Sequence, residues 1–201
     1  CSSLASVTIP YSVTLIGNST FIRCTSLTSV TIPDSVTSIG EWAFEDCVSL
    51  TSVIIPDSVT EIGYAAFADC DSLTSFYGKF ASVDNRCLIA NGKLIAFAIG
   101  CGATEYTIPD SVTSIGSSAF QQCESLTSVT IGNSVTSIAE RAFLLCASLR
   151  SITIPGSVTE IGERAFASCT SLTNITIPDS VTEIGDAAFA ICTSLTSFYG
   201  K

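Results

Sequence analysis

Cysteine is the residue type through which this chain could do most chemistry, because thiols form disulfides, bind metal ions and act as nucleophiles. Eight of the ten cysteines recur at intervals of 23 residues: Cys1, Cys24, Cys47 and Cys70, then Cys123, Cys146, Cys169 and Cys192. Zinc sites use close ligand pairs, yet the chain has no C-x-x-C motif and no histidine. Thiols one period apart would point the same way, which disfavours disulfides between them. We therefore predict a column of thiols that pack as small apolar side chains, without metal or cofactor.

Other catalytic groups are equally scarce. The absence of histidine removes the usual general base, and no serine lies in a G-x-S-x-G motif. Carboxylates such as Glu45 and Asp46 fall on predicted turns, where solvation is expected instead of the burial that separates the pKa values of an acid–base pair. We predict that the chain is not an enzyme.

The elements that position these residues follow from the repeat itself. Within one period, Val30 to Ile32 alternates like a half-buried strand, and Pro33 ends it by removing a donor. Val36 to Ile39 can form a second extended piece before Gly40. Residues 41–47 have room for one or two helical turns. A coil of this kind buries its apolar residues only by stacking on other coils, so we predict a right-handed parallel solenoid.

The repeat resembles a known family. The pattern L-x-x-V-x-I-P-x-S-V-x-x-I-G-x-x-A-F-x-x-C is similar to BspA-like leucine-rich repeats, and it occurs at 27–47, 50–70, 126–146, 149–169 and 172–192. The resemblance implies a leucine-rich-repeat solenoid at the cell surface or outside the cell. It also implies adhesion, with extracellular-matrix proteins, other surface proteins and glycans as partners. A passive spacer without a ligand on these repeats is the alternative.

Residues 1–201 are predicted to be one solenoid domain of about eight coils. The coils begin at residues 1, 24, 47, 70, 101, 123, 146 and 169, with a partial coil at 192. The coil from Cys70 is longer, and Asn91-Gly92 between apolar runs predicts a β-hairpin near 87–97 that replaces the back wall of that coil. Because 192–201 copies 70–79, we expect a fragment of a longer array. A disulfide between Cys87 and Cys101 stays open.

Several columns are expected to serve the structure. They are the cysteine, serine and phenylalanine ladders: Cys24, Cys47, Cys70, Cys123, Cys146 and Cys169; Ser35, Ser58 and Ser111; and Phe44, Phe67, Phe143 and Phe166. A serine hydroxyl just after a buried turn can satisfy backbone groups of its own and the adjacent coil.

The charge and hydropathy of the chain limit the classes of partner that we expect it to bind. Eight basic against 18 acidic residues give a net charge of −10, and the basic residues are scattered. We expect no nucleic-acid partner. No apolar run approaches the length of a membrane helix, so we expect no membrane insertion by this segment.

Ligand-binding candidates lie where the repeats differ. They are three large aromatic residues and three arginines: Trp42, Tyr64, Tyr77, Arg141, Arg150 and Arg164. Outward threonines on the first strand, such as Thr31, Thr130 and Thr153, would form a flat face of hydroxyls. That face is explained by β-propensity and solubility, or by adhesion to extended ligands, or by an ice-binding array that Ile54 and Arg150 interrupt.

Overall fold

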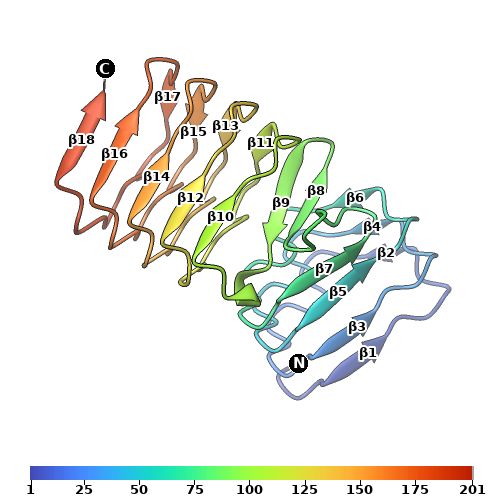
Figure 1. The fold of residues 1–201 in the computed structure, drawn as a ribbon. Helices are drawn as coiled ribbons and strands as arrows, with labels where there is room; N and C mark the ends of the chain where they lie inside the picture. The colour runs from blue at the N-terminus through green and yellow to red at the C-terminus, as the bar shows by residue number, and fades with distance from the viewer. Residues whose placement is uncertain (201) are drawn as a thin grey trace. The chain divides into compact units, whose positions relative to one another are not determined.

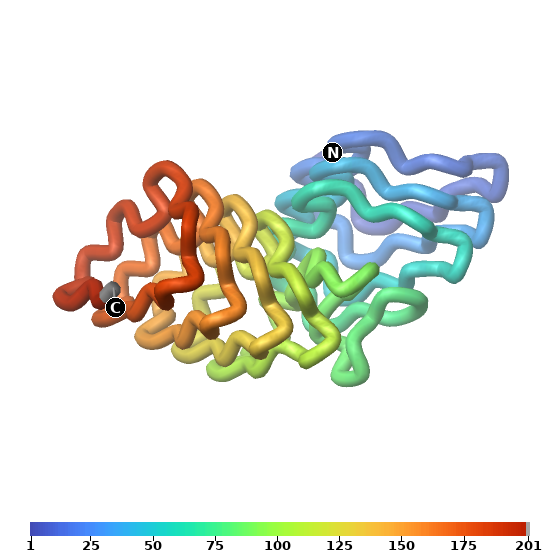
Figure 2. The backbone as a smooth tube through the Cα atoms, turned by 90° about the horizontal axis from the view of Figure 1, so that it is seen from above, coloured from blue at the N-terminus to red at the C-terminus, as the bar shows by residue number. Residues whose placement is uncertain are grey.

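The computed structural model describes residues 1–200, whose coils stack with their strands in parallel (Figure 1). Two compact units are distinguished. The first comprises Cys1–Ala90 and Ile95–Cys101, and the second comprises Asn91–Leu94 and the chain from Gly102 onward. Successive coils follow nearly the same path within each unit (Figure 2). The predicted β-solenoid with coils of about 23 residues is confirmed.

Most coils contribute one strand to a first side and a shorter strand to a second side. In the first unit, the first side contains β1 (Ser6–Thr8), β3 (Ser29–Thr31), β5 (Ser52–Ile55) and β7 (Ser75–Gly78), and the second contains β2 (Leu15–Ile16), β4 (Ser38–Ile39) and β6 (Glu61–Ile62). In the second unit, the first side contains β10 (Glu105–Thr107), β12 (Ser128–Thr130), β14 (Ser151–Thr153), β16 (Asn174–Ile177) and β18 (Ser197–Gly200). Its second side contains β11 (Ser114–Ile115), β13 (Ser137–Ile138), β15 (Glu160–Ile161) and β17 (Glu183–Ile184).

The pairing between strands follows the 23-residue period of the sequence. Ser29 pairs with Ser6, and Val30 with Val7, so each residue lies beside the residue 23 positions away. Because strand side chains alternate, the second residue of each first-side strand points inward and its neighbours point outward. Like residues therefore form columns, and the inward columns make a continuous apolar core.

Phenylalanine forms the most regular of these columns. In the first unit, Phe44 stacks on Phe21 at 5.2 Å and on Phe67 at 5.3 Å between ring centroids. In the second unit, Phe143 stacks on Phe120 at 4.9 Å and on Phe166 at 5.2 Å. The interplanar angles are between 2° and 16°, because the repeat translates each ring without turning it.

The third side of each coil is where the sequence prediction was wrong. Residues 41–47 form no helix, and within residues 1–200 the only helix is a 3-10 turn at Ile99–Cys101. The backbone N–H groups of Trp42, Phe44 and Asp46 instead donate to carbonyls of the next coil, at 2.9, 2.8 and 3.0 Å. A helix would direct the same donors to its own preceding turn, so bonding between coils excludes it.

This third side holds two columns of left-handed residues, with φ between 49° and 62°. The first column contains Ser19, Trp42, Ala65, Ser118, Arg141, Arg164 and Ala187, and the second contains Arg23, Asp46, Asp69, Gln122, Leu145, Ser168 and Ile191. Left-handed φ is unfavourable for every residue but glycine. In most members the backbone N–H donates to a carbonyl of the next coil, as it does in Trp42 and Asp46, and these bonds help to hold the backbone there.

The β-hairpin predicted near 87–97 is confirmed. Strands β8 (Cys87–Ala90) and β9 (Lys93–Phe97) are joined by Asn91-Gly92, both with positive φ. Neither left-handed column of the third side has a member in this coil. Lys93 and Leu94 pair with Ser114 and Ile115 of β11, so β9 occupies a second-side position in the stack.

A column of glycines marks the closest approach between coils. Gly162 donates its N–H to the Ile138 carbonyl at 2.7 Å, and a Cβ added to Gly162 would lie 2.5 Å from the Glu140 nitrogen. Ala139 occupies the same register position, and its N–H lies 3.0 Å from the Ile115 carbonyl. We infer that a methyl group here pushes the coils apart. Close approach, and not positive φ, is the reason for glycine.

Replacing Gly162 by alanine should therefore lower the free energy of unfolding by about 1–3 kcal/mol, as overpacking does. Gly17 begins the same column, but a Cβ there would meet only the Thr20 hydroxyl, at 3.5 Å. Gly17→Ala is the matched control, and it should change stability by less than about 1 kcal/mol. Urea unfolding of the two variants measures the difference; equal effects would contradict the close-approach explanation.

Candidate binding surfaces

The outward face of the first-side strands is flat and nearly uncharged. In the first unit it presents Ser6, Thr8, Ser29, Thr31, Ser52, Ile54, Ser75 and Tyr77, with no charged residue. Ile54 lies beside Tyr77 in the β5–β7 pair, and these side chains are 64% and 42% exposed. In the second unit the column Thr107, Thr130, Thr153 and Thr176 continues the hydroxyl pattern, with Glu105 at one edge.

Not every threonine column is available to a ligand. The Thr37 hydroxyl donates to the Thr14 carbonyl of the preceding coil at 3.1 Å, and Thr159 donates to Thr136 at 3.2 Å. Those hydroxyls form hydrogen bonds between neighbouring coils. The outward Thr31 and Thr153 hydroxyls make no such bond among the described residues, so their hydrogen-bonding capacity faces solvent.

The cysteine ladder is integrated into the core. The Cys70 thiol donates to the Phe44 carbonyl at 3.3 Å, and the Cys146 thiol donates to the Phe120 carbonyl at 3.1 Å. Burial raises the pKa of Cys70 and of Cys146 well above the ordinary value. Thiols held protonated in this way are poor nucleophiles. Cys101 carries a free thiol, so the bridge to Cys87 left open by the sequence is not formed.

A thiol reagent should distinguish these environments. At a pH near 8, Ellman's reagent is expected to modify the exposed Cys1 rapidly, whereas Cys146 and Cys169 should react only as fast as the array unfolds. Mass mapping of the modified peptides before and after addition of urea would identify the sites. Rapid labelling of Cys146 in the folded protein would contradict its assignment to the core.

The serine ladder also bonds between coils. Ser35 donates to the Val13 carbonyl at 2.7 Å, and Ser58 donates to the Val36 carbonyl at 2.7 Å. Ser111 lies differently, because it is exposed and follows the coil in which the hairpin replaces the usual turn. The Val59 carbonyl, which has the register of Val13 and Val36, accepts a bond from the Lys79 ammonium at 2.7 Å.

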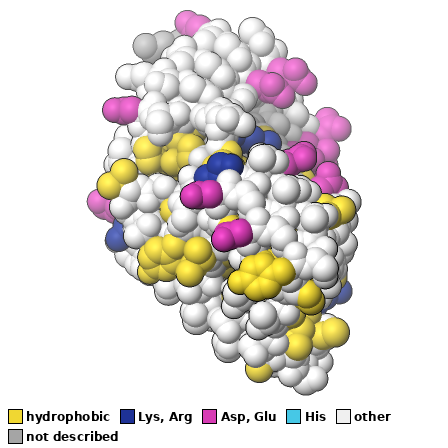
Figure 3. All heavy atoms as spheres, turned by 90° about the vertical axis from the view of Figure 1, so that its right-hand side faces the viewer, with side chains coloured by type: hydrophobic (Ala, Val, Ile, Leu, Met, Phe, Trp, Pro, Cys, Tyr) yellow, Lys and Arg dark blue, Asp and Glu magenta, His cyan; other side chains and the backbone are white. Residues whose placement is uncertain are grey.

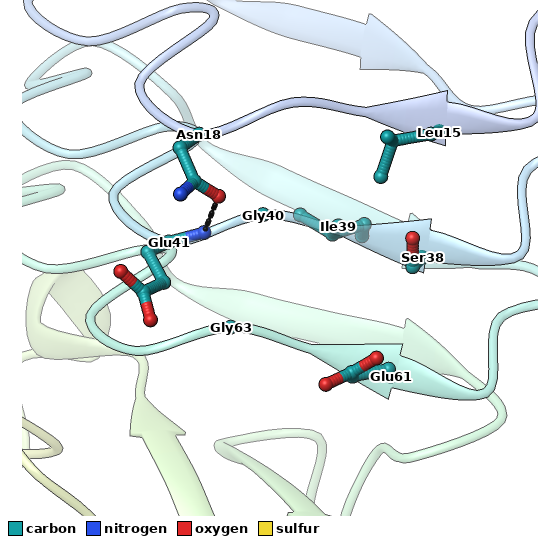
Figure 4. A pocket seen from close by; sticks show the side chains of 8 residues that line it. All are labelled: Leu15, Asn18, Ser38, Ile39, Gly40, Glu41, Glu61 and Gly63. Atoms are coloured by element: carbon teal, nitrogen blue, oxygen red, sulfur yellow. Dashed lines mark hydrogen bonds between the residues drawn. The ribbon is translucent and has the colours of Figure 1, made fainter.

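A shallow depression of about 220 Å³ lies on the second side of the first unit. It is lined by Leu15, Asn18, Ser38, Ile39, Gly40, Glu41, Glu61 and Gly63 (Figure 4). The Asn18 side chain accepts a bond from the Glu41 N–H at 2.9 Å and fixes one edge. In Figure 4, the Glu41 and Glu61 side chains lie on either side of Gly63. Nothing in the repeat pattern predicts this depression.

The family assignment rests on the whole chain. The sequence profile of the BspA type leucine rich repeat region matches residues 1–100 and 95–201, in six copies. The chain belongs to this family. Among curated proteins, none matches this BspA-type chain. Among solved structures, it is similar to a leucine rich cell surface protein from Faecalibacterium prausnitzii A2-165, with 34% identity and a TM-score of 0.80. That alignment covers 100% of this chain and 61% of the other.

Two further structures support the fold of the BspA-type array. The pneumococcal vaccine antigen PcpA has a TM-score of 0.82 at 20% identity, over 98% of this chain and 57% of that one. A leucine-rich repeat protein of T. pallidum has a TM-score of 0.53 at 28% identity, over 95% and 78%. The chain thus spans about three-fifths of the first two proteins.

The sequence-predicted binding residues of the BspA-type array fall on different sides. Trp42 and Tyr64 lie together, with ring centroids 5.3 Å apart in a T-shaped contact. Tyr77 belongs to the strand face. Arg141 and Arg164 sit in the first left-handed column on the third side, where their ion-pair partners are Glu140 at 3.3 Å and Glu163 at 3.6 Å.

The sixth candidate, Arg150, is exposed and immediately precedes β14. No group of three or more potential metal ligands occurs among residues 1–200 of the BspA-type array. Nor does that part of the chain contain a helix of the length and apolarity that a bilayer crossing needs. On the face drawn in Figure 3, hydrophobic side chains form separate small patches among polar ones.

Proposed function

We propose that this BspA-type array is a non-enzymatic adhesive segment of a cell-surface or secreted protein. It binds surface or matrix proteins, and glycans, through weak contacts that recur from coil to coil. The observation that carries the proposal is the strand face, which offers serine and threonine hydroxyl groups at most steps of the parallel ladders. The similarity to a leucine rich cell surface protein supports the location.

The non-enzymatic role is supported by the side chains themselves. The chain has no histidine, and burial raises the pKa of the Cys70 and Cys146 thiols, which keeps them in the protonated form. The alternative of a passive spacer predicts no ligand on any side of these coils.

The proposal is tested by measuring the binding of this protein to a panel of immobilised extracellular-matrix proteins and glycans. We expect at least one ligand to bind, and Tyr77→Ala to weaken that binding several-fold, because exposed aromatic residues dominate interface energies. Tyr11→Ala is the matched control, since Tyr11 is 81% exposed but lies outside the strands. Failure of every ligand at high concentration would favour the spacer.

A further inference from the structure

The turn that precedes the third side carries a glutamate in several coils, and the residue after it decides whether that charge is neutralised. In the second unit, Glu140 and Glu163 are each followed by an arginine that pairs with the carboxylate. In the first unit, Glu41 is followed by Trp42 instead. Among the described residues, the Glu41 carboxylate has no cationic partner.

Glu41 also lies in the depression, where a second carboxylate joins it. Glu61 comes from β6, and it too lacks an ion pair among residues 1–200. No basic residue lines the depression, and Leu15 gives it an apolar edge that is 57% exposed. The depression therefore combines an unbalanced negative charge with apolar surface.

An aromatic pair follows two of the lining residues in the chain, although neither ring lines the depression itself. Trp42 follows Glu41 in the chain and Tyr64 follows Gly63, and both Glu41 and Gly63 line the depression. Both rings are half-buried and contact each other edge to face, which holds the indole in position. In the second unit, the side chain at the register of Trp42 reaches the preceding glutamate, since Arg141 lies 3.3 Å from Glu140. A carboxylate and an indole ring placed in this way attract a cation by charge and by cation–π contact.

We propose that the depression and the Trp42–Tyr64 pair bind a basic segment of a partner protein. Lysine or arginine side chains of that segment meet the Glu41 and Glu61 carboxylates and the Trp42 ring, while Leu15 contacts their aliphatic stems. The inference deepens the proposed adhesive function, on which it rests, by naming the chemistry of one partner and a site away from the strand face.

Trp42 provides the measurement, because it is the only tryptophan in the chain. Titration of the whole protein with a hexa-arginine peptide should give a saturable change in tryptophan emission that weakens at high salt. A hexaglutamine peptide should give none. The absence of a saturable change with hexa-arginine would overturn the proposal.

Matched charge variants distinguish binding at the depression from non-specific attraction of a basic peptide to an acidic protein. Glu41→Gln with Glu61→Gln should weaken hexa-arginine binding by roughly tenfold. Glu160→Gln with Glu183→Gln removes the same charge from β15 and β17 of the second unit and should leave binding nearly unchanged. Equal losses in both double variants would overturn the proposal.

Trp42→Ala, followed by calorimetry, tests the aromatic contribution. Binding should weaken about fivefold, while cooperative urea unfolding is retained. Wild-type affinity in this variant would contradict the role of the ring. The Glu41→Gln, Glu61→Gln protein should also be applied to the ligand panel. The wild-type protein and this double variant could both bind a ligand of the panel while hexa-arginine binds neither. In that case this inference fails and the adhesive function stands.

Discussion

The free energy of unfolding is expected to fall steeply as the pH rises above about 9. Burial raises the pKa of Cys47 from 9.0 to about 12, and it raises the pKa of Cys70, Cys146 and Cys169 at least as clearly. Above the unfolded pKa, the unfolded chain releases these protons while the folded chain keeps them. The unfolded state then binds fewer protons, so stability decreases with pH.

The expected size of this effect is large. Each buried thiol removes up to about 1.4 kcal/mol per pH unit in the window between its unfolded and folded pKa values. Four such thiols would together remove roughly 5 kcal/mol per pH unit, enough to unfold a protein of ordinary stability within about two units. Below that window the contribution of the thiols to stability is fully present.

Urea unfolding at a series of pH values between about 8 and 10.5 measures the slope. The control is Cys146→Ala with Cys169→Ala, because tyrosine and lysine titrate equally in both proteins. This variant should be less stable near neutral pH, yet its slope should be shallower by roughly 3 kcal/mol per pH unit. An unchanged slope would contradict the burial of protonated thiols.

Phe143→Ala should lower the free energy of unfolding by about 3–5 kcal/mol. Phe143 is fully buried and lies between two parallel rings, so its removal leaves a cavity that neither neighbour can fill without giving up its own stacking. The loss also breaks the continuity between coils on which a solenoid depends.

Phe21→Ala is the control for this cavity. Phe21 is only partly buried and contacts one stacked ring, Phe44, so its replacement should cost clearly less. Urea unfolding of both variants gives the comparison. A loss below about 1 kcal/mol for Phe143→Ala would contradict the stacked core.

The sides of the coil differ in how far the sequence predicts them. A fixed period places each residue beside its counterpart, so the strands around Val30 and Val36 and the apolar columns follow directly. The third side does not, because the spacing of Ala43, Phe44 and Cys47 fits a helical turn equally well. In the structure, the Phe44 N–H donates to the Ala66 carbonyl of the next coil, and the sequence of a single coil cannot reveal such a bond.

The candidate binding surfaces were less accessible to sequence reasoning. Trp42 and Tyr64 stand out as aromatic exceptions to the repeat, but their contact joins residues 22 positions apart, which a period of 23 does not bring to one column. The depression takes residues from three coils and from several register positions. The signal that could have revealed it is the missing arginine after Glu41, seen by comparing coils position by position.

The two left-handed columns have a consequence for how such proteins diversify. Most of their backbone N–H groups donate to the next coil, and alanine, serine, arginine, aspartate, tryptophan and leucine all occur there with nearly the same φ. At the members of these columns that are not buried, a point mutation thus changes the displayed side chain without changing the path of the chain. Selection can alter the specificity of one coil while its neighbours, and the scaffold, stay as they are.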